Sequence, residues 1–355
     1  MQRNLYCLLI GICLLAASCY KDKGNYVYHV PAAPVVTNLA DAYPAIIGDT
    51  LTIRPNVSIP GVKNIGYEWR LNLPFPDTAR YYYGPQLKMV FAFKPMRYGA
   101  RLTVIDSSNG MKYFYSFFID GSTVYSSGTT VLSQEGGKTQ LSFILPDGTV
   151  KPRVYSAINE EDLPAGPQQV IALYDQYISG GTYFGYWILC SGGADPGVQI
   201  DPNTFQKVKT LRENFFTPPA SVNTGTCVNI PGTGTINGVL NGKLYVGASQ
   251  TYYGSPVYGQ FGLATTGDYN LYHQAIFNPT FPYFLGYDSV RKQVVAFTNF
   301  GSASYIGTGY QTTTTGPFDP ANLGLDLVDF EQINSQNCYV FGKASDGTLY
   351  EAKFG

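Results

Sequence analysis

Histidine is scarce in this sequence, whose 355 residues contain only His29 and His273. A metal site built from several histidines is therefore excluded, and a Ser-His-Asp triad would have to use His273. No Gly-x-Ser-x-Gly turn accompanies that residue, so we expect it to be an ordinary strand or surface residue. Charged residues are also few, at 13%, with 23 basic and 24 acidic side chains. Without a basic field, nucleic acid is not an expected partner.

The motifs of cofactor and ion binding are missing as well. The glycine-rich stretch 222–234 lacks the Gly-Lys-Ser/Thr ending of a phosphate loop, and no Asp-x-Asp-x-Asp-Gly calcium run occurs. We therefore predict neither a cofactor nor a metal site. A hydrolase would need two carboxyl groups about 5–10 Å apart, but most aspartates here stand beside Gly, Pro or Asn, as turn residues do. We therefore expect no enzyme activity. The aspartates considered as members of such a pair are Asp147, Asp175, Asp195, Asp201, Asp268 and Asp288.

Long hydrophobic runs are also missing near the N-terminus. The apolar run at residues 5–15 is well below the roughly 20 residues of a transmembrane helix. It follows Arg3 and precedes small residues, which is the order of a secretory signal. Residues 14–19 (Leu-Leu-Ala-Ala-Ser-Cys) resemble the lipobox of bacterial lipoproteins. The resemblance implies that a signal peptide, residues 1–18, is removed and that Cys19 carries a lipid.

Few cysteines remain once the signal peptide is removed. An odd number of thiols cannot all pair with one another, and exported proteins rarely keep exposed thiols. We expect them to be buried as small hydrophobic side chains, and a disulfide between Cys190 and Cys227 is the alternative. Cys7 and Cys13 lie in the signal peptide and Cys19 carries the lipid, so the remaining thiols are Cys190, Cys227 and Cys338.

The remaining composition favours β-structure. The 30 Tyr, 21 Phe and 39 Gly residues indicate strands and tight turns. Residues 35–122 are predicted to form a small β-sandwich, because apolar and polar residues alternate around Trp69. A single Trp on a central strand is typical of an immunoglobulin-like sandwich. Residues 108–110 (Ser-Asn-Gly) predict a hairpin between its last two strands.

The N-terminal segment carries a specific resemblance. Residues 19–26 (Cys-Tyr-Lys-Asp-Lys-Gly-Asn-Tyr), followed by a sandwich with residues 67–69 (Tyr-Glu-Trp) on a strand, resemble the PKD-like family lipoproteins of Bacteroidota. The resemblance implies a tether at residues 19–34 and an N-terminal PKD/immunoglobulin-like domain. It also implies a lipid anchor in the outer membrane, at the cell surface or on the periplasmic face, often beside glycan-uptake systems. It supplies no catalytic residues.

Residues 123–355 repeat a pattern of a polar turn followed by a short strand. Residues 241–245 (Asn-Gly-Lys-Leu-Tyr) and 346–350 (Asp-Gly-Thr-Leu-Tyr) are alike, and residues 287–295 follow the same pattern. At about 40–45 residues per unit, the segment predicts a β-propeller-like domain of roughly five or six blades. We expect the ring to close by pairing of the strand at 348–353 near residue 130. A second β-sandwich or a jelly roll is the alternative.

Clusters of aromatic residues are the candidate ligand sites. Neighbouring residues of a strand point to opposite faces, so the three tyrosines at 81–83 cannot all be buried. Exposed rings beside amides suit sugars, whereas plain packing in sheets is the alternative explanation for abundant Tyr. The candidate ligand-binding residues are Tyr252, Tyr253, Tyr82 and Trp187.

Together these features predict a non-catalytic, lipid-anchored protein of the cell envelope. Its expected partners are the membrane, through the anchor, and a glycan, an outer-membrane transporter or another envelope protein. A propeller-type glycoside hydrolase or lyase is the first alternative, and carboxylates clustered at the mouth of the propeller would distinguish it. A scaffold that contacts a transporter is the second, and an exposed apolar patch would distinguish it.

Overall fold

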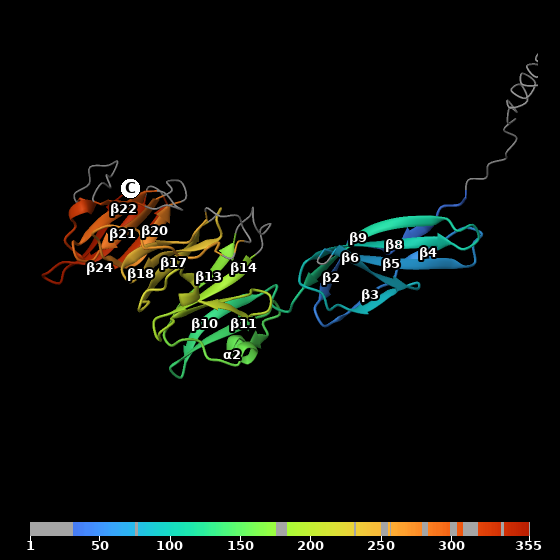
Figure 1. The fold of residues 1–355 in the computed structure, drawn as a ribbon, viewed down its shortest axis with the longest axis horizontal. Helices are drawn as coiled ribbons and strands as arrows, with labels where there is room; N and C mark the ends of the chain where they lie inside the picture. The colour runs from blue at the N-terminus through green and yellow to red at the C-terminus, as the bar shows by residue number, and fades with distance from the viewer. Residues whose placement is uncertain are drawn as a thin grey trace, which may run out of the picture. The chain divides into compact units, whose positions relative to one another are not determined.

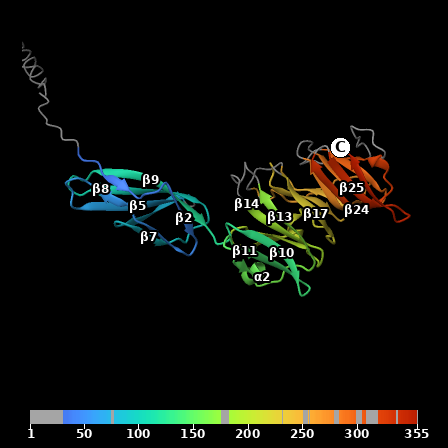
Figure 2. The same cartoon turned by 180° about the vertical axis from the view of Figure 1, so that it is seen from behind.

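The structure is a computed structural model that describes residues 31–74, 77–174, 183–230, 232–249, 255, 257–278, 283–298, 304–307, 319–334 and 337–354. This part of the chain is all-β (Figures 1 and 2). None of its helices is long and apolar enough to cross a membrane. The chain divides into two compact units: the first holds the described residues up to Tyr43, Thr50–Met89 and Arg97–Ile119, and the second holds Pro44–Asp49, Val90–Met96 and Asp120–Gly355.

Strands β1–β9 form the immunoglobulin-like part of the fold. A five-stranded sheet has the order β2-β9-β8-β5-β6, and the pairs β3-β7 and β1-β4 form two smaller sheets. The strands are β1 (Val35–Thr37), β2 (Ala42–Ile46), β3 (Thr50–Ile53), β4 (Asn56–Ser58), β5 (Ile65–Pro74), β6 (Asp77–Tyr83), β7 (Leu87–Val90), β8 (Arg97–Asp106) and β9 (Lys112–Ser122).

Trp69 is central to this sandwich, as the sequence predicts. It lies on β5, between β6 and β8, and its side chain is 1% exposed. The indole Nε1 donates a hydrogen bond to the carbonyl oxygen of Gly84 at 2.9 Å, and the ring meets Phe117 edge to face, with centroids 6.0 Å apart. The immunoglobulin-like prediction is therefore confirmed for this part of the chain.

The predicted hairpin at residues 108–110 joins β8 to β9. The Asp106 carboxylate accepts hydrogen bonds from the Ser108 backbone N–H at 2.8 Å and from its hydroxyl at 2.6 Å. Gly110 adopts φ +76°, which a residue with a side chain rarely does. These local interactions fix the turn, and the hydrogen bonds from Ser108 lower the pKa of Asp106.

The second unit contains five antiparallel sheets that follow one another along the chain. The first sheet is β10 (Thr129–Glu135), β11 (Lys138–Ile144) and β12 (Val150–Lys151); the second is β13 (Pro167–Tyr174), β14 (Tyr183–Cys190), β15 (Gly197–Ile200) and β16 (Lys207–Thr210); the third is β17 (Thr224–Ile230), β18 (Thr235–Leu240) and β19 (Lys243–Val246). The fourth is β20 (Leu271–Asn278), β21 (Tyr283–Asp288), β22 (Gln293–Thr298) and β23 (Ser304–Gly307); the fifth is β24 (Asp326–Asn334), β25 (Asn337–Lys343) and β26 (Leu349–Phe354). Short helices lie between strands: α2 (Val154–Asn159), η1 (Arg212–Asn214) and η2 (Pro320–Asn322).

Apolar cores lie between successive sheets of this unit. Because side chains alternate across a strand, a central strand contributes to the core on each side. On β14, Ile188 joins the core shared with the first sheet, whereas Trp187 joins the core shared with the third. Val239 on β18 likewise packs toward the fourth sheet, and Val294 on β22 packs toward the fifth. The five sheets are therefore a continuous stack of layers with a core at each junction.

The turns between strands use aspartate and glycine as the repeated pattern predicts. The carboxylates of Asp147 and Asp346 each accept a hydrogen bond from the backbone N–H two residues on, at 2.9 Å. These bonds lower the pKa of both carboxyl groups. Asn241 and Gly242 both have positive φ, +53° and +68°, as a tight two-residue hairpin turn between β18 and β19 requires. The aspartates in these turns thus shape the backbone.

The expected ring closure does not appear among the described strands. Strand β26 pairs with β25, and β10 pairs with β11, so residues 348–353 do not pair near residue 130. Figures 1 and 2 show the first sheet and the fifth sheet at opposite ends of the second unit. The turn pattern that suggested blades is local, and it carries no information about the angle between one sheet and the next.

All three cysteines in the second unit are free and buried, so the disulfide alternative is wrong. Cys190 lies in the core between the first and second sheets, whereas Cys227 lies in the core between the second and third. Their side chains therefore face different layers. Burial raises the pKa of Cys190 to about 11 and that of Cys227 to about 12, and it also raises the pKa of Cys338.

Candidate functional site

The predicted ligand residues fall in different parts of the chain. Cys19, Tyr252 and Tyr253 lie outside the described residues. Tyr82 is half-buried on β6, and burial raises its pKa. It belongs to the first unit, whereas Trp187 belongs to β14 of the second. Its neighbours Tyr81 and Tyr83 are the exposed residues of the triplet, at 49% and 72%. Successive residues of a strand point to opposite faces of the sheet, so Tyr81 and Tyr83 share the face opposite to Tyr82.

Trp187 does not provide the open stacking face expected of it. Its side chain is 1% exposed and belongs to the core between the second and third sheets. It nevertheless borders a cavity of about 470 Å³ at that junction. The second sheet contributes Leu173, Phe184, Trp187, Gln199, Val208 and Lys209, and the facing wall contributes Asn214, Gly234, Thr235, Ile236, Ser255, Tyr258 and Gly259.

One row of side chains across the second sheet forms the floor of this cavity. Trp187 pairs with Gln199 across β14 and β15, and Gln199 pairs with Lys209 across β15 and β16. Directly paired residues share a face of the sheet. Gly185 leaves room for the Gln199 amide, because a Cβ at that position would lie 2.7 Å from its Nε2. No described residue forms a hydrogen bond with the Gln199 side chain.

Lys209 brings a positive charge to the cavity. Its Nζ lies 5.8 Å from the centroid of the Trp187 ring, within the range of a cation–π contact. Among the described residues, no carboxylate forms an ion pair with it. Burial lowers the pKa of Lys209, and the charge of Glu213 opposes that effect. The Glu213 carboxylate also accepts a hydrogen bond from the Thr210 backbone N–H at 2.7 Å.

The facing wall is held in place by its own hydrogen bonds. Asn214 is 1% exposed, and its Nδ2 donates to the Gly259 carbonyl oxygen at 3.2 Å. Its backbone carbonyl accepts the Phe261 N–H at 2.7 Å, and the Tyr258 hydroxyl donates to the Thr233 carbonyl oxygen. The Tyr258 and Phe184 rings are both partly exposed. They give the cavity the accessible aromatic surface that Trp187 does not.

The cavity therefore combines aromatic surface, two side-chain amides and one cation. Such a mixture suits a ligand with an apolar face and several hydroxyl groups, since a few polar groups fix orientation while rings supply contact area. No carboxylate lines the cavity within the described residues. Within the same part of the chain, no group of three or more His, Cys, Asp and Glu residues could hold a metal ion. His273 is exposed on β20.

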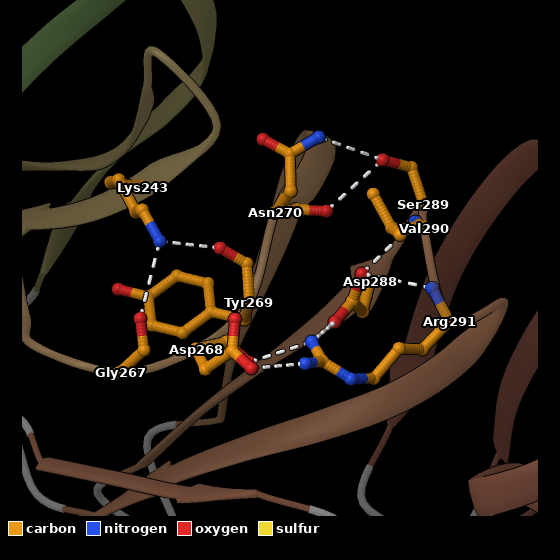
Figure 3. Close-up of polar contacts among 9 residues, drawn as sticks. All are labelled: Lys243, Gly267, Asp268, Tyr269, Asn270, Asp288, Ser289, Val290 and Arg291. Carbon is orange, nitrogen blue, oxygen red and sulfur yellow. Dashed lines mark hydrogen bonds and ion pairs between the residues drawn. The ribbon is translucent and has the colours of Figure 1, made fainter.

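Two of the aspartates considered from the sequence do meet, but in a structural network (Figure 3). The Arg291 guanidinium donates to the Asp288 carboxylate at 2.9 Å and to the Asp268 backbone carbonyl at 2.7 Å, and it also pairs with the Asp268 carboxylate. These acidic partners raise the pKa of Arg291. Nearby, the Ser289 hydroxyl donates to the Asn270 carbonyl oxygen at 3.0 Å. Because these groups bind one another, we assign the network to the β21–β22 turn and not to a reaction.

Lys243 fastens the third sheet to the same segment. Its ammonium group donates to the backbone carbonyls of Gly267, at 3.2 Å, and Tyr269. It also lies 4.2 Å from the centroid of the Tyr269 ring (Figure 3). Unlike Lys209, this lysine is satisfied by protein acceptors.

An apolar groove of about 560 Å³ lies on the fifth sheet. Three of its hydrophobic side chains are exposed, Val328, Leu349 and Tyr350. The other residues that line it are Asp329, Phe341, Gly342 and Glu351.

Sequence reasoning missed most of the cavity. Phe184 lies in an aromatic cluster that the sequence singles out, but nothing near Gln199, Lys209, Asn214 or Tyr258 marks those residues as neighbours. The pairing register of β14, β15 and β16 is what aligns Trp187, Gln199 and Lys209, and sequence alone does not fix that register.

Comparison with known proteins supports the N-terminal part of the fold. The PKD-like family matches residues 19–167, so the chain carries a PKD-like family domain there. The match extends beyond the sandwich predicted at 35–122 and includes strands β10–β12 and helix α2 of the second unit. No curated protein matches the chain. The cavity lies at residues 173–259, beyond the matched region.

Proposed function

We propose that the protein is a non-catalytic binding protein of the cell envelope that holds a glycan in the cavity between the second and third sheets. The observation that carries the proposal is that two partly exposed aromatic residues, Phe184 and Tyr258, line the same cavity as Gln199 and Asn214. A sugar presents an apolar ring face and a rim of hydroxyl groups, which match these two kinds of surface.

Calorimetry and affinity electrophoresis against a panel of polysaccharides test this proposal. We expect Phe184→Ala and Tyr258→Ala each to weaken binding by about tenfold, which corresponds to roughly 1.4 kcal/mol. Tyr83→Ala is the matched control, because that ring is 72% exposed and lies outside the cavity. A Tyr252→Ala/Tyr253→Ala variant tests the two candidates outside the described residues. Absence of binding to every glycan, or binding that both cavity variants leave unchanged, would contradict the proposal.

We also propose that Cys19 is lipidated and anchors the protein in the outer membrane, on the lipobox resemblance. Mass spectrometry of membrane-extracted protein is expected to find a diacylglyceryl group on Cys19. A Cys19→Ala protein is expected to leave the membrane fraction. If that variant still fractionated with membranes, the anchor would be elsewhere.

The propeller-like architecture stays a prediction of this proposal. Five successive antiparallel sheets with similar turns support it. Small-angle scattering of the purified protein would distinguish a closed ring from an open row of sheets, because the row is longer in one dimension. A profile that fits only the open row would contradict a propeller.

A second candidate function, contact with an outer-membrane transporter, is favoured by the apolar groove on the fifth sheet. Exposed contiguous apolar surface is a feature of protein interaction sites. We expect Val328→Ser/Leu349→Ser to abolish co-purification with an outer-membrane transporter, without changing glycan binding. A variant that co-purified as the unaltered protein does would contradict this role. A hydrolase or lyase stays the alternative; the described residues that line the cavity include no carboxylate, whereas Asp329 and Glu351 line the groove.

A further inference from the structure

We propose that the ligand of the cavity is an acidic saccharide, a sugar that carries a carboxylate or a sulfate, and that Lys209 selects it. The inference rests on the proposed function and concerns the class of sugar. It starts from Lys209, the only cationic side chain among the described residues that line the cavity. No described carboxylate forms an ion pair with Lys209.

Some lysines of the second unit form ion pairs, and Lys209 differs from these. Lys207, two residues earlier on β16, forms an ion pair with Glu161 at 2.7 Å. Lys138 and Lys292 form ion pairs at 2.7 Å with Asp162 and Asp326. Lys209, by contrast, lies against the Trp187 ring, which attracts a cation but leaves its charge available. Glu213 acts on this charge from a distance but forms no ion pair with it, and an anionic ligand would supply a direct partner.

A β-bulge directs the two lysines to different sides of the second sheet. Lys209 pairs with Gln199 and Lys207 pairs with the adjacent residue Ile200, so the register shifts at this point. Strict alternation would place residues 207 and 209 on one face. With the bulge, Lys209 lies beside Gln199 and Trp187. Lys207 instead pairs with Ile200, whose side chain belongs to the core shared with the first sheet. Bulges commonly re-aim side chains at functional positions.

The groups around Lys209 complete a site for one charged sugar ring. The Gln199 amide lies on the same face and has no hydrogen-bond partner among the described residues. An anionic group at Lys209 would therefore leave the Gln199 amide for a hydroxyl of the same ring.

Calorimetry with two matched pairs of polysaccharides tests the inference. Polygalacturonate is compared with its methyl ester, which keeps the ring and removes the charge, and dextran sulfate is compared with dextran. We expect the protein to bind one of the two acidic polymers at least tenfold more tightly than its neutral counterpart, which identifies carboxylate or sulfate as the anion. Lys209→Gln is expected to remove this preference, and Lys209→Arg to retain most of it. Lys151→Gln is the control, because Lys151 is exposed on β12, outside the cavity.

The outcomes separate this inference from the proposed function. Equal affinity for each acidic polymer and its neutral counterpart would overturn the acidic preference and leave glycan binding intact. A preference that survived in Lys209→Gln would assign selection to another residue and overturn the role of Lys209. Absence of binding to all four polymers and to the wider glycan panel would overturn the glycan proposal and this inference together. Circular dichroism of Lys209→Gln checks that the variant is folded before any loss is interpreted.

Discussion

Replacing Asp288 by alanine is expected to destabilise the second unit more than any comparable change in its other turns. The side chain is 0% exposed and accepts three hydrogen bonds: from the backbone N–H groups of Val290, at 3.0 Å, and Arg291, at 3.2 Å, and from the Arg291 guanidinium, at 2.9 Å. Alanine removes all three and leaves a gap beneath the β21–β22 turn.

The magnitude follows from these contacts. Each hydrogen bond from the backbone to the carboxylate contributes about 1–1.5 kcal/mol. Arg291 is 40% exposed, so its ion pair is screened by water and adds no more than about 1 kcal/mol. The expected loss for Asp288→Ala is therefore about 2–4 kcal/mol. For a unit of this size that is a fall in melting temperature of roughly 5–15 °C. Asp288→Asn keeps an oxygen for the turn and is expected to lose only about 1 kcal/mol.

The two tryptophans provide the assay, because each lies in a different unit. Trp69 lies in the first unit and Trp187 in the second. In a Trp69→Phe background, Trp187 fluorescence during urea unfolding reports on the second unit alone. The control is Asp346→Ala, at the equivalent turn of the fifth sheet, where the side chain is exposed and accepts a hydrogen bond from the Thr348 backbone N–H at 2.9 Å.

We expect the Trp69→Phe background to be most stable and Asp288→Ala least stable, with Asp288→Asn and Asp346→Ala between them. If Asp288→Ala and Asp346→Ala shifted the Trp187 transition equally, burial of Asp288 would not govern its contribution. If Asp288→Asn cost as much as Asp288→Ala, the negative charge would matter more than the turn hydrogen bonds.

Two further predictions concern thiols and acid. Burial raises the pKa of Cys190 and Cys227 to about 11 and 12. Neither thiol is therefore expected to react with iodoacetamide at pH 8 until the protein unfolds. Mass spectrometry that found either thiol modified in the folded protein would contradict the buried placement. The lowered pKa values of Asp147 and Asp346 stabilise the fold above the ordinary value of 3.8, and this contribution is lost as the pH falls through the lowered values. The difference in unfolding free energy between the unaltered protein and Asp147→Ala is therefore expected to shrink below pH 3.8, and a difference that stayed constant down to pH 2 would refute this linkage.

Local signals in the sequence predicted the first unit well. The buried Trp69 and the Asp106–Gly110 hairpin depend on alternation and on turn residues that lie close together in the chain. The same is true of the Asx turns at Asp147 and Asp346. What separates Asp288 from them is burial, which depends on Arg291 and on the neighbouring segment that ends at Asn270. The difference in burial arises from packing, and it cannot be predicted from the three turn sequences.

The arrangement of the sheets could not be predicted in the same way. Turn spacing identified short antiparallel units, and the structure has five of them in the second unit. Ring closure depends on the angle at every junction, and those angles are set by which side chains fill each core. The side chains of β14 show the point, because Ile188 and Trp187 are adjacent in sequence and belong to cores on opposite sides of one sheet.

The cavity depends on two local departures from a regular sheet. Gly185 leaves the space that the Gln199 amide occupies, and the bulge in β16 brings Lys209 beside Gln199. A regular strand through residues 207–209 would instead place both lysines on the same face, where Glu161 could serve only one of them. The sequence Lys-Val-Lys looks like an ordinary exposed edge strand, and Val208 is indeed 59% exposed. The bulge therefore converts an unremarkable strand into one that offers a paired lysine to the fold and an unpaired lysine to a ligand.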